Sequence, residues 1–342
     1  MSEDAKMKVG MIGVGKYGAV RRGHMRQTGL FEIAACYNRS MPAMEQCHKE
    51  DGARITGSYG ELLDTPGIEA MFICTGAMYH AEQTRQALEK GLHVFVEKPL
   101  CSTPAEMREL LALQRKTGLV VGVGHEDHTN DAESRIIKGM IDRGEMGIIV
   151  AFEKTTCHSG GFQIKPGDWR GNAEKNPGGM LFQCGVHGIH ELMYYFGPIK
   201  SVFSRMKYDL HTTLTADVAH CILELDSGLL GTLSAYHITP YRHHLNIYGT
   251  KRNIYRDSKS WMEEPVFEMQ DVGRNNAMEP RIPIKVTEKG DPAGHIRSFH
   301  HAVRNGGTPY PSIVDGARAV AVVFAAEESA KSGKTVAVER IG

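Results

Sequence analysis

A carboxylate and an amine stand directly after a short run of strand-forming residues. The run is His-Val-Phe-Val at 93–96, and Glu97, Lys98 and Pro99 follow it. Proline has no N–H to donate to a strand ladder, so the strand is expected to end here. Because ligands bind beyond the carboxyl ends of strands in an open parallel sheet, we predict that Lys98 lies in a ligand crevice. A solvated lysine beside a turn is the alternative that this stretch alone leaves open.

A glycine-rich loop follows a predicted strand at 8–12. Residues 13–18 read GVGKYG, and a helical pattern begins at about Tyr17. In this strand–turn–helix context the first glycine would permit a tight turn, the second the approach of a pyrophosphate, and the third close helix packing. The amide groups at the helix N-terminus would bind the phosphates. The loop residues expected to bind a dinucleotide are Gly13, Gly15, Lys16, Tyr17 and Gly18.

The next strand, expected at 32–37, ends in Asn38 and Arg39. Dinucleotide-binding folds usually place an acidic residue here, which binds the adenosine ribose hydroxyls. Without that carboxylate a 2′-phosphate is not repelled, and Arg39 could pair with it. We therefore expect both residues to contact the cofactor, and we favour NADP over NAD. An Arg39 side chain stacked on the adenine, which would suit either cofactor, is the alternative.

A second group of candidates lies at 178–196, where two glycines precede a helical pattern that contains His187 and His190. At a spacing of i and i+3 the two side chains share one face of a helix. An imidazole next to a cofactor could move a proton at neutral pH. A histidine of the core or of a helix cap is the structural alternative.

The elements that would position these residues alternate between strand and helix through the first third of the chain. Such alternation predicts an α/β fold with a doubly wound parallel sheet and right-handed crossovers. Thr75 and Gly76 break the third strand at the same sheet edge as the glycine loop. Strands are expected at 8–12, 32–37, 69–74, 92–96 and 119–123, and helices from 17, at 41–50, at 59–63, at 79–90 and from Ser102 or Thr103 to 116.

The chain changes character after Gly124. The alternation in its later strands predicts a mostly antiparallel sheet with one covered face. We expect a Rossmann dinucleotide-binding domain at 1–124 and a substrate-binding and oligomerisation α+β domain at 125–342, whose final helix could pack on the first domain. Residues 256–290 show no pattern that places them. Expected helices are 132–143, 295–305 and 315–332, and expected strands are 147–157, 199–208, 216–225, 229–237, 244–250 and 336–338.

Composition excludes several classes of function. The length of 342 residues suggests about two domains, and Lys+Arg and Asp+Glu balance at 40 each, so no net field favours nucleic acid or a membrane surface. No apolar run approaches the roughly 18 residues of a membrane span, and the N-terminus lacks the apolar core of a signal peptide. The seven cysteines form no C-x-x-C pair, which is typical of reduced thiols. We expect a cytoplasmic protein.

Together these stretches resemble the Gfo/Idh/MocA family (glucose–fructose oxidoreductase, inositol dehydrogenase and rhizopine catabolism proteins). The matching stretches are residues 13–18, 75–80, 93–99 and 178–187, in the family's order. The resemblance implies a Rossmann domain and a C-terminal domain whose sheet often forms a homodimer or homotetramer interface. It also implies oxidation or reduction of a secondary alcohol or ketone on a sugar, cyclitol or related polyol with NAD or NADP.

The resemblance implies roles for single residues. Lys98 matches the family lysine that contacts the nicotinamide ribose and the substrate hydroxyl, and His187 matches the acid/base histidine. Gln183 stands where the family usually has an aspartate, and it can hydrogen-bond a substrate hydroxyl but cannot ionise. Which of Lys98 and His187 carries the proton therefore stays open. The matching stretches add four cofactor contacts, namely Thr75, Gly76, His80 and Glu97.

Five further side chains are candidates for substrate contact. Trp169 could stack on a sugar face and Arg170 could bind a substrate acid or a cofactor phosphate, with a loop anchor as the alternative. His190 replaces a further family aspartate, and Glu126 replaces the asparagine usual after the last strand of the first domain. His158 is the remaining candidate for a hydroxyl contact.

Two other functions and a metal site are open alternatives. A lyase or glycosidase that oxidises its substrate transiently would retain its cofactor and show no net reduction. A cofactor-binding sensor would turn nothing over, although retention of both Lys98 and His187 argues against it. The histidine pairs at 125–128 and 187–190 have a spacing compatible with metal binding. No cysteine joins them and the family does not generally use metal, so we predict none.

Overall fold

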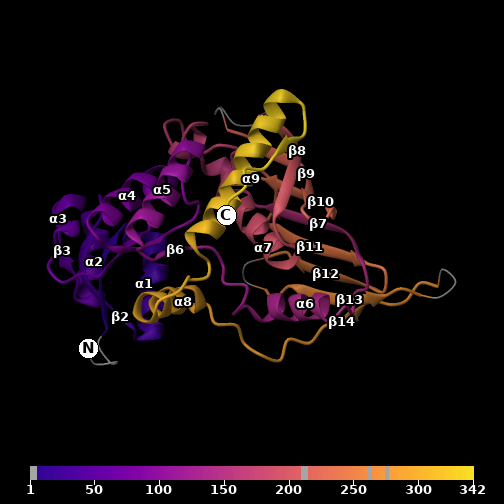
Figure 1. Ribbon diagram of the computed structural model, residues 1–342, viewed down its shortest axis with the longest axis horizontal. Coiled ribbons are helices and arrows are strands. Elements are labelled where there is room, and N and C mark those ends of the chain that lie inside the picture. Colours follow the sequence, from indigo (N-terminus) through magenta and orange to yellow (C-terminus); the bar gives the residue numbers. More distant parts are fainter. Residues whose placement is uncertain (1–5, 209–214, 261–262, 274–276) are drawn as a thin grey trace. The chain divides into compact units, whose positions relative to one another are not determined.

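The computed structural model of the chain describes residues 6–208, 215–260, 263–273 and 277–342. Contacts divide the chain into two compact units (Figure 1). Unit 1 is Met1–Asp127 with Asp291–Ala317, and unit 2 is His128–Gly290 with Arg318–Gly342. The sequence analysis placed the boundary at residue 124 and assigned every later residue to the second domain. The structure differs in that the segment 291–317 belongs to unit 1.

Unit 1 contains the parallel sheet that strand–helix alternation predicted. Its strands pair in the order β3-β2-β1-β4-β5-β6, and each neighbouring pair runs parallel. The strand β3 was not predicted, because two residues have no readable period. The strands are β1 (Met7–Ile12), β2 (Phe31–Tyr37), β3 (Arg54–Ile55), β4 (Ala70–Ile73), β5 (His93–Val96) and β6 (Val121–Val123). The helices are α1 (Lys16–Thr28), α2 (Met41–Asp51), α3 (Tyr59–Leu63), η1 (Ala77–Tyr79), α4 (His80–Glu89), α5 (Pro104–Thr117) and α8 (Gly294–Asn305).

Helix α5 shows how local sequence determines where an element begins. Thr103 Oγ1 accepts a hydrogen bond from the Glu106 backbone N–H at 3.2 Å, and Glu106 Oε2 accepts one from the Thr103 N–H at 3.0 Å. This capping box satisfies two backbone donors at once and begins the helix at Pro104. Of the two predicted caps, Ser102 and Thr103, the structure therefore uses the second.

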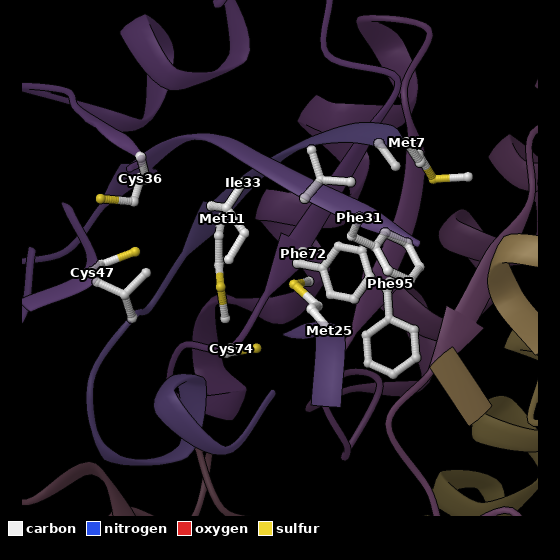
Figure 2. Close-up of a cluster of buried hydrophobic side chains, with 14 of the residues drawn as sticks. Met7, Met11, Met25, Phe31, Ile33, Cys36, Cys47, Phe72, Cys74 and Phe95 are labelled. Carbon is white, nitrogen blue, oxygen red and sulfur yellow. The ribbon is translucent and has the colours of Figure 1, made fainter. Parts of the chain in front are cut away.

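Figure 2 shows Phe31, Phe72 and Phe95 in the apolar core of unit 1, to which Phe299 of the later segment also belongs. Phe72 of β4 and Phe95 of β5 stack with their ring centroids 4.9 Å apart, and Phe31 of β2 meets Phe72 edge-on at 5.4 Å. Helix α8 adds Phe299, whose ring lies 5.6 Å from Phe72 and 5.8 Å from Phe95. Burial of these rings provides much of the apolar contact between the sheet and α8.

Unit 2 contains the mostly antiparallel sheet. Its strands pair in the order β14-β13-β12-β11-β7-β10-β9-β8-β15, and among the described strands only β7 and β10 pair in parallel. The strands are β7 (Ile149–Cys157), β8 (Ile199–Lys207), β9 (Val218–Leu225), β10 (Leu230–Tyr236), β11 (Arg242–Gly249), β12 (Arg252–Ser258), β13 (Val266–Asp271), β14 (Ile282–Pro283) and β15 (Val336–Ala337). The helices are α6 (Ala132–Asp142), η2 (Gly160–Gln163), η3 (Trp169–Gly171), η4 (Leu181–Gly185), α7 (Val186–Phe196) and α9 (Ile313–Ser332), the last of which begins in unit 1.

The strands of this sheet bury one face, as their alternation predicted. In β7, Phe152, Lys154 and Thr156 are buried, whereas Glu153 is exposed. Leu245 of β11 lies opposite Lys154 in the register. A lysine therefore occupies the covered, mainly apolar face of the sheet, which is an expensive place for a charge unless it is paired.

Residues 256–290, which showed no sequence pattern, include the end of β12 and the strands β13 and β14. Positions 261–262 and 274–276 lie outside the described residues. Within β13 the side chain of Phe267 is buried and the rest are partly or fully exposed. A strand with a single buried position has no period of two, so pattern reasoning could not identify it.

Candidate functional site

The glycine loop joins β1 to α1 at the carboxyl end of the parallel sheet. Gly13 has a φ of 87°, and a Cβ there would lie 2.5 Å from the Cys74 carbonyl carbon. A Cβ on Gly18 would lie 2.1 Å from the Gly13 carbonyl oxygen, so the helix can pack this closely only with glycine. At Gly15 a Cβ would meet no described atom within 4 Å, and no described side chain caps α1 there. This open helix N-terminus fits the pyrophosphate of a dinucleotide.

The neighbouring side chains of the loop and of β2 are accessible. Lys16 and Tyr17 are exposed on the first turn of α1. At the end of β2, Asn38 is partly exposed and Arg39 is exposed, with its guanidinium 6.0 Å from the centre of the Tyr79 ring. An arginine paired with an aromatic ring could hold an adenine between them or bind a phosphate beside it. Tyr79 was not predicted to contact the cofactor, because the sequence shows only that it follows β4 at the same edge of the sheet.

His80 holds the loop after β4 in place. Its Nδ1 lies 2.7 Å from the Pro99 carbonyl oxygen and its Nε2 lies 3.1 Å from the Thr75 carbonyl oxygen. The ring is buried, and burial lowers its pKa despite these two carbonyl groups. Thr75 Oγ1 donates a hydrogen bond to Gln83 Oε1 at 2.6 Å. His80 therefore links the loop at Thr75 and Gly76 to the Glu-Lys-Pro segment and would act on a cofactor through them.

Lys98 follows β5 and is partly exposed at the same sheet edge, before a cis peptide bond to Pro99. Its neighbour Glu97 points into the protein, where it forms a buried ion pair with Arg21 of α1. Arg21 also donates a hydrogen bond to the Gly124 carbonyl oxygen at 3.3 Å. The two adjacent charged residues of the motif thus have different surroundings. Glu97 is fixed inside the unit, and Lys98 remains accessible to a ligand.

His295 of α8 completes this buried group. Arg21 Nη1 lies 2.6 Å from His295 Nε2, and because a guanidinium only donates, that ring nitrogen accepts. Burial and the nearby Arg21 charge lower the pKa of His295 to about 2, so the imidazole is neutral at physiological pH. The sequence analysis did not identify Arg21 or His295, because their partners are more than 70 residues away.

Gln183 and His187 lie on one continuous helical segment of unit 2. Gln183 belongs to η4, a π-helical turn, and His187 to the first turn of α7, which continues from it. Both side chains are partly exposed, whereas their neighbours Leu181, Phe182 and Val186 are buried. Single π-helical turns occur frequently at functional sites. The segment therefore presents the Gln183 amide and the His187 imidazole from the sequence region that was predicted to be a helix. The π-helical turn at its start was not predicted.

Three side chains meet beside this segment at the ends of β7 and β10. His158 Nε2 lies 3.3 Å from Cys184 Sγ, and the rings of His158 and His237 are 5.2 Å apart. The Gly160 backbone N–H donates to His158 Nδ1 at 2.8 Å, so a neutral ring carries its proton on Nε2, toward the thiol. His158, a predicted substrate contact, thus lies against Cys184, the residue that follows Gln183.

His190 is buried, unlike its predicted partner His187. Its ring lies 5.2 Å from His128, whose Nδ1 is 3.1 Å from Ser134 Oγ. Burial, His190 and the nearby cations lower the pKa of His128 to about 3. The structure therefore places His190 in a packed aromatic group on the covered face rather than beside His187 at the exposed edge.

A buried group of charges lies under α7. Glu191 accepts hydrogen bonds from Lys154 Nζ of β7 at 2.6 Å and from Arg256 of β12. The Tyr195 hydroxyl also donates to it at 3.3 Å. Burial raises the pKa of Glu191, but the Arg256 and Lys154 charges outweigh this and hold the pKa well below its usual range. Sequence reasoning missed this group, although a lysine at a buried position of an alternating strand was a readable signal.

The remaining predicted residues lie on the short helix η3 and on the segment after β6. The Arg170 guanidinium lies 4.9 Å from the Trp169 ring centre, and the Arg170 carbonyl oxygen accepts from Asn176 Nδ2 at 2.6 Å. The backbone of this loop is therefore anchored while the Arg170 side chain stays exposed. Glu126, after β6 in unit 1, is also exposed. These positions are accessible to a substrate.

The described residues also bear on metal binding and on membrane insertion. No group of three or more His, Cys, Asp or Glu side chains in the described ranges could hold a metal ion. In the same part of the chain, no helix is long and apolar enough to cross a membrane.

The glycine loop on a parallel sheet, with a lysine at the end of β5, defines an NAD(P)-binding oxidoreductase with a Rossmann domain and a second sheet domain. The chain belongs to the Gfo/Idh/MocA family. Residues 7–125 match the oxidoreductase family model with an NAD-binding Rossmann fold, and residues 134–255 match the Gfo/Idh/MocA C-terminal domain. The resemblance inferred from the four sequence stretches is therefore confirmed.

Related proteins of known activity use both nicotinamide cofactors. An NAD⁺-dependent scyllo-inositol 2-dehydrogenase of Bacillus subtilis is 26% identical over 82% of this chain and 80% of its own length. An NADP⁺-dependent scyllo-inositol 2-dehydrogenase of the same organism is 24% identical over 97% and 96%. A 1,5-anhydro-D-fructose reductase of Ensifer adhaerens is 24% identical over 93% and 94%.

Solved structures share the fold over nearly the whole chain. A candidate NADPH-dependent oxidoreductase from Desulfitobacterium hafniense superimposes with a TM-score of 0.89 at 26% identity, covering 97% of this chain and 98% of that one. A levoglucosan dehydrogenase in complex with NADH gives a TM-score of 0.86 at 19% identity, covering 98% and 100%. At that identity the second likeness concerns the fold alone.

Proposed function

We propose that this protein transfers a hydride between NAD(P) and a secondary alcohol or ketone of a sugar, cyclitol or sugar derivative. The observation that carries the proposal is the position of Lys98. It is accessible after β5, and β5, β4 and β1 are neighbours in a parallel sheet, so Lys98 shares a sheet edge with the glycine loop. The relatives that act on inositols and an anhydrosugar support the substrate class.

The residues of unit 1 fit a dinucleotide, which would supply the hydride acceptor when bound. Gly15 and the open N-terminus of α1 would bind its phosphates, and Arg39 with Tyr79 would bind its adenosine end. Lys98 would hydrogen-bond the reacting oxygen of the substrate. On oxidation the alcohol carbon loses a hydride and its hydroxyl loses a proton, and a side chain of the protein must take that proton.

His187 and Gln183 of unit 2 are the proposed partners of Lys98 in this step. An imidazole can accept the hydroxyl proton and return it in the reverse direction, whereas the Gln183 amide can only orient the substrate by hydrogen bonding. Trp169, Arg170, Glu126 and His158 are the proposed further substrate contacts. The buried His190 would act through the packing of α7.

The proposed cofactor preference is NADP. Arg39 is exposed where an acidic residue would exclude a 2′-phosphate, and a guanidinium can pair with that group. Replacing Arg39→Ala is expected to weaken NADPH binding about tenfold, the loss of one charge-assisted contact, and to change NADH binding about twofold or less. Fluorescence titration of the bound nicotinamide measures both, with Arg26→Ala on the far end of α1 as a control. Equal losses for NADPH and NADH would contradict a 2′-phosphate contact and favour adenine stacking.

We also propose a cytoplasmic homodimer or homotetramer formed through the outer face of the unit 2 sheet. Ile222 of β9 and Leu230 of β10 are 51% and 53% exposed there. A hollow of about 270 Å³ on this face has Phe203 and Ile222 in its lining. Exposed apolar side chains grouped on one face are typical of an interface. All seven cysteines carry free thiols, which suits a reducing compartment.

The proposed activity is tested by nicotinamide absorbance. Purified protein would be assayed with NAD⁺ and NADP⁺ in parallel against sugars, cyclitols and sugar acids, and with NADH and NADPH against the matching ketones. Net reduction or oxidation of the cofactor by one substrate class supports the proposal. Bound cofactor without net turnover in either direction contradicts it, and glycoside cleavage in that case would identify the transient-oxidation lyase.

A further inference from the structure

The residues around Glu191 form a buried group of two cations and two carboxylates. Lys154 and Glu191 are 5% and 3% exposed, and their paired atoms are 2.6 Å apart. Arg256 reaches the other carboxylate oxygen of Glu191. Two cations thus share one carboxylate, and the Glu133 carboxylate is more distant, 3.6 Å from Arg256. We call Lys154, Glu191 and Arg256 the charge triad.

The triad contacts the helical turn that carries His187. Glu191 is four residues after His187, which is one turn along the same side of α7. Gly188, the residue next to His187, packs on the Lys154 stem, because a Cβ there would lie 3.2 Å from Lys154 Cγ and 3.3 Å from its Cε. Lys154 therefore touches the helix twice, through its stem at Gly188 and through its amine at Glu191.

The triad also connects α7 to two separate strands, β7 and β12. The π-helical turn before α7 changes the angular relation between Gln183 and the residues that follow. Apolar contacts alone would permit small rotations of the helix, whereas two cations from separate strands fix the carboxylate between β7 and β12. An apolar cluster of equal volume would be at least as favourable for stability, so the ions are better explained by the position and field they provide.

The electrostatic field of the triad acts on the histidines around it. Burial and then the Lys154 charge lower the pKa of His243 on β11 to about 4, and the pKa of His128 is lowered to about 3. The elements packed against η4 and α7 within unit 2 add His158 after β7 and His237 after β10, and the helical segment itself adds Cys184, His190, Tyr194 and Tyr195. Lys154 and Arg256 are the cations among these groups, Glu191 is the carboxylate nearest to them, and helix α6, which also packs on α7, adds Glu133 at 3.6 Å from Arg256.

We propose that Lys154, Glu191 and Arg256 are positioning residues that fix the orientation of His187 and supply the electrostatic field in which it exchanges its proton. The expected effect of the triad on turnover rests on the proposed catalytic role of His187. The expected effect of the triad on the titration of the His187 imidazole does not depend on that role.

Substitutions that change the charge of the triad in opposite directions distinguish this electrostatic role from a merely structural one. Lys154→Met removes a cation with little change of shape, so the titration midpoint of His187 should rise by about one pH unit. Glu191→Gln removes the anion, so the midpoint should fall by a similar amount. In the double variant the net charge of the triad returns to its original value, and the midpoint should return to within a few tenths of a pH unit of the parent protein.

The midpoint is measured by NMR of ¹³C-labelled histidine in the full chain, with the His187 signal assigned from its absence in His187→Asn. Lys200→Met, which removes the exposed Lys200–Glu224 pair at 2.7 Å, is the matched control and should leave the midpoint unchanged. If Glu191→Gln does not fold, the rise in Lys154→Met alone carries the test. An unchanged midpoint in Lys154→Met, or shifts of the same sign in both single variants, would overturn the inference.

The pH profile of kcat/KM then distinguishes the two proposals. If its limb moves with the NMR midpoint, both the inference and the catalytic role of His187 are supported. If the midpoint moves and the limb does not, the triad still acts on His187 as inferred, but the proposed function of His187 fails.

Discussion

Each unit has a buried group of charged side chains near its proposed catalytic residue, and the two groups differ in how their charges are paired. In unit 1, Arg21 pairs with a single carboxylate, Glu97, and directs its other N–H groups to neutral acceptors, including His295 at 2.6 Å. In unit 2, Glu191 is shared by two cations, Lys154 and Arg256. The first group is a single compact pair, whereas in the second two cations flank one carboxylate and the second carboxylate, Glu133, is more distant, at 3.6 Å from Arg256. Glu97 of the first group precedes Lys98 directly, and Glu191 of the second group is four residues after His187.

This difference separates two tasks that a buried ion pair can perform. A neutral pair fixes geometry, since its charges largely cancel at a distance, and Arg21 uses it to join the ends of β5 and β6 to α1 and α8. A group whose charges are spread over several elements also changes the proton affinity of its neighbours. We therefore expect changes in the Arg21 group to affect folding most, and changes in the triad to affect pH dependence most.

The largest effect is expected at Lys98, which the Arg21 group positions. Lys98→Met removes a proposed proton donor and acceptor while keeping an apolar stem, so kcat/KM should fall by about 10²–10⁴-fold. Cofactor affinity, measured by fluorescence titration, should stay within about tenfold. Lys90→Met, which removes an exposed lysine paired with Asp64, is the control. Unchanged turnover in Lys98→Met would remove Lys98 from the mechanism and leave His187 as the proton carrier.

The next effect concerns stability in unit 1. Arg21→Met leaves the Glu97 carboxylate buried without its cation, and breaking such a pair from one side typically costs about 3–5 kcal/mol. Urea unfolding measures this loss. Arg26→Met on the same helix removes a half-exposed arginine from Asp51, which keeps Arg22 as a partner, and should cost about 1 kcal/mol or less. Similar losses in the two variants would show that the Arg21 group is not the structural anchor proposed here.

A smaller effect is expected on the pH dependence of the free energy of unfolding, because each unit contains a buried neutral histidine. The pKa is about 2 for His295 in unit 1 and about 3 for His128 in unit 2, both below the value of about 6.5 in an unfolded chain. Between these values the unfolded state binds more protons, so stability falls as the pH drops below about 6.5. At pH 5 each histidine should cost about 2 kcal/mol relative to pH 7.

Replacing either histidine should therefore reduce the acid sensitivity of the protein. His295→Gln keeps an acceptor for Arg21, and its loss of unfolding free energy between pH 7 and pH 5 should be about 2 kcal/mol smaller than that of the parent protein. His220→Gln, at an exposed position on β9, is the control and should leave the loss unchanged. An equal pH dependence in the His295 variant would mean that His295 is not held neutral by Arg21.

Sequence reasoning identified the parts of the site whose signals are local. The glycine loop, the end of β5 at Glu97 and the helix with His187 each follow from a stretch of fewer than about 20 residues. The partners of these residues were not identified, since Arg21 and Glu97 are 76 positions apart and Glu191 and Arg256 are 65 apart. Such pairs depend on strand register and helix rotation, which a single sequence does not reveal.

The same limit explains where the fold differs from the sequence prediction or goes beyond it. The segment 291–317 was assigned to the second domain because it follows that domain in sequence, whereas Phe299 buries itself against the Phe72 and Phe95 rings of the first. The strand β13 has one buried side chain and no period of two. In both cases the decisive contact is made with residues distant in the chain.

The central claim is that a hydride passes directly between a substrate carbon and the nicotinamide. With a substrate found in the absorbance panel, we would place deuterium on its carbinol carbon and follow a single turnover by mass spectrometry. The account predicts one deuterium on the reduced nicotinamide and a ketone product without it. Deuterium kept by the product or lost to water, with no labelled cofactor formed, would contradict the account.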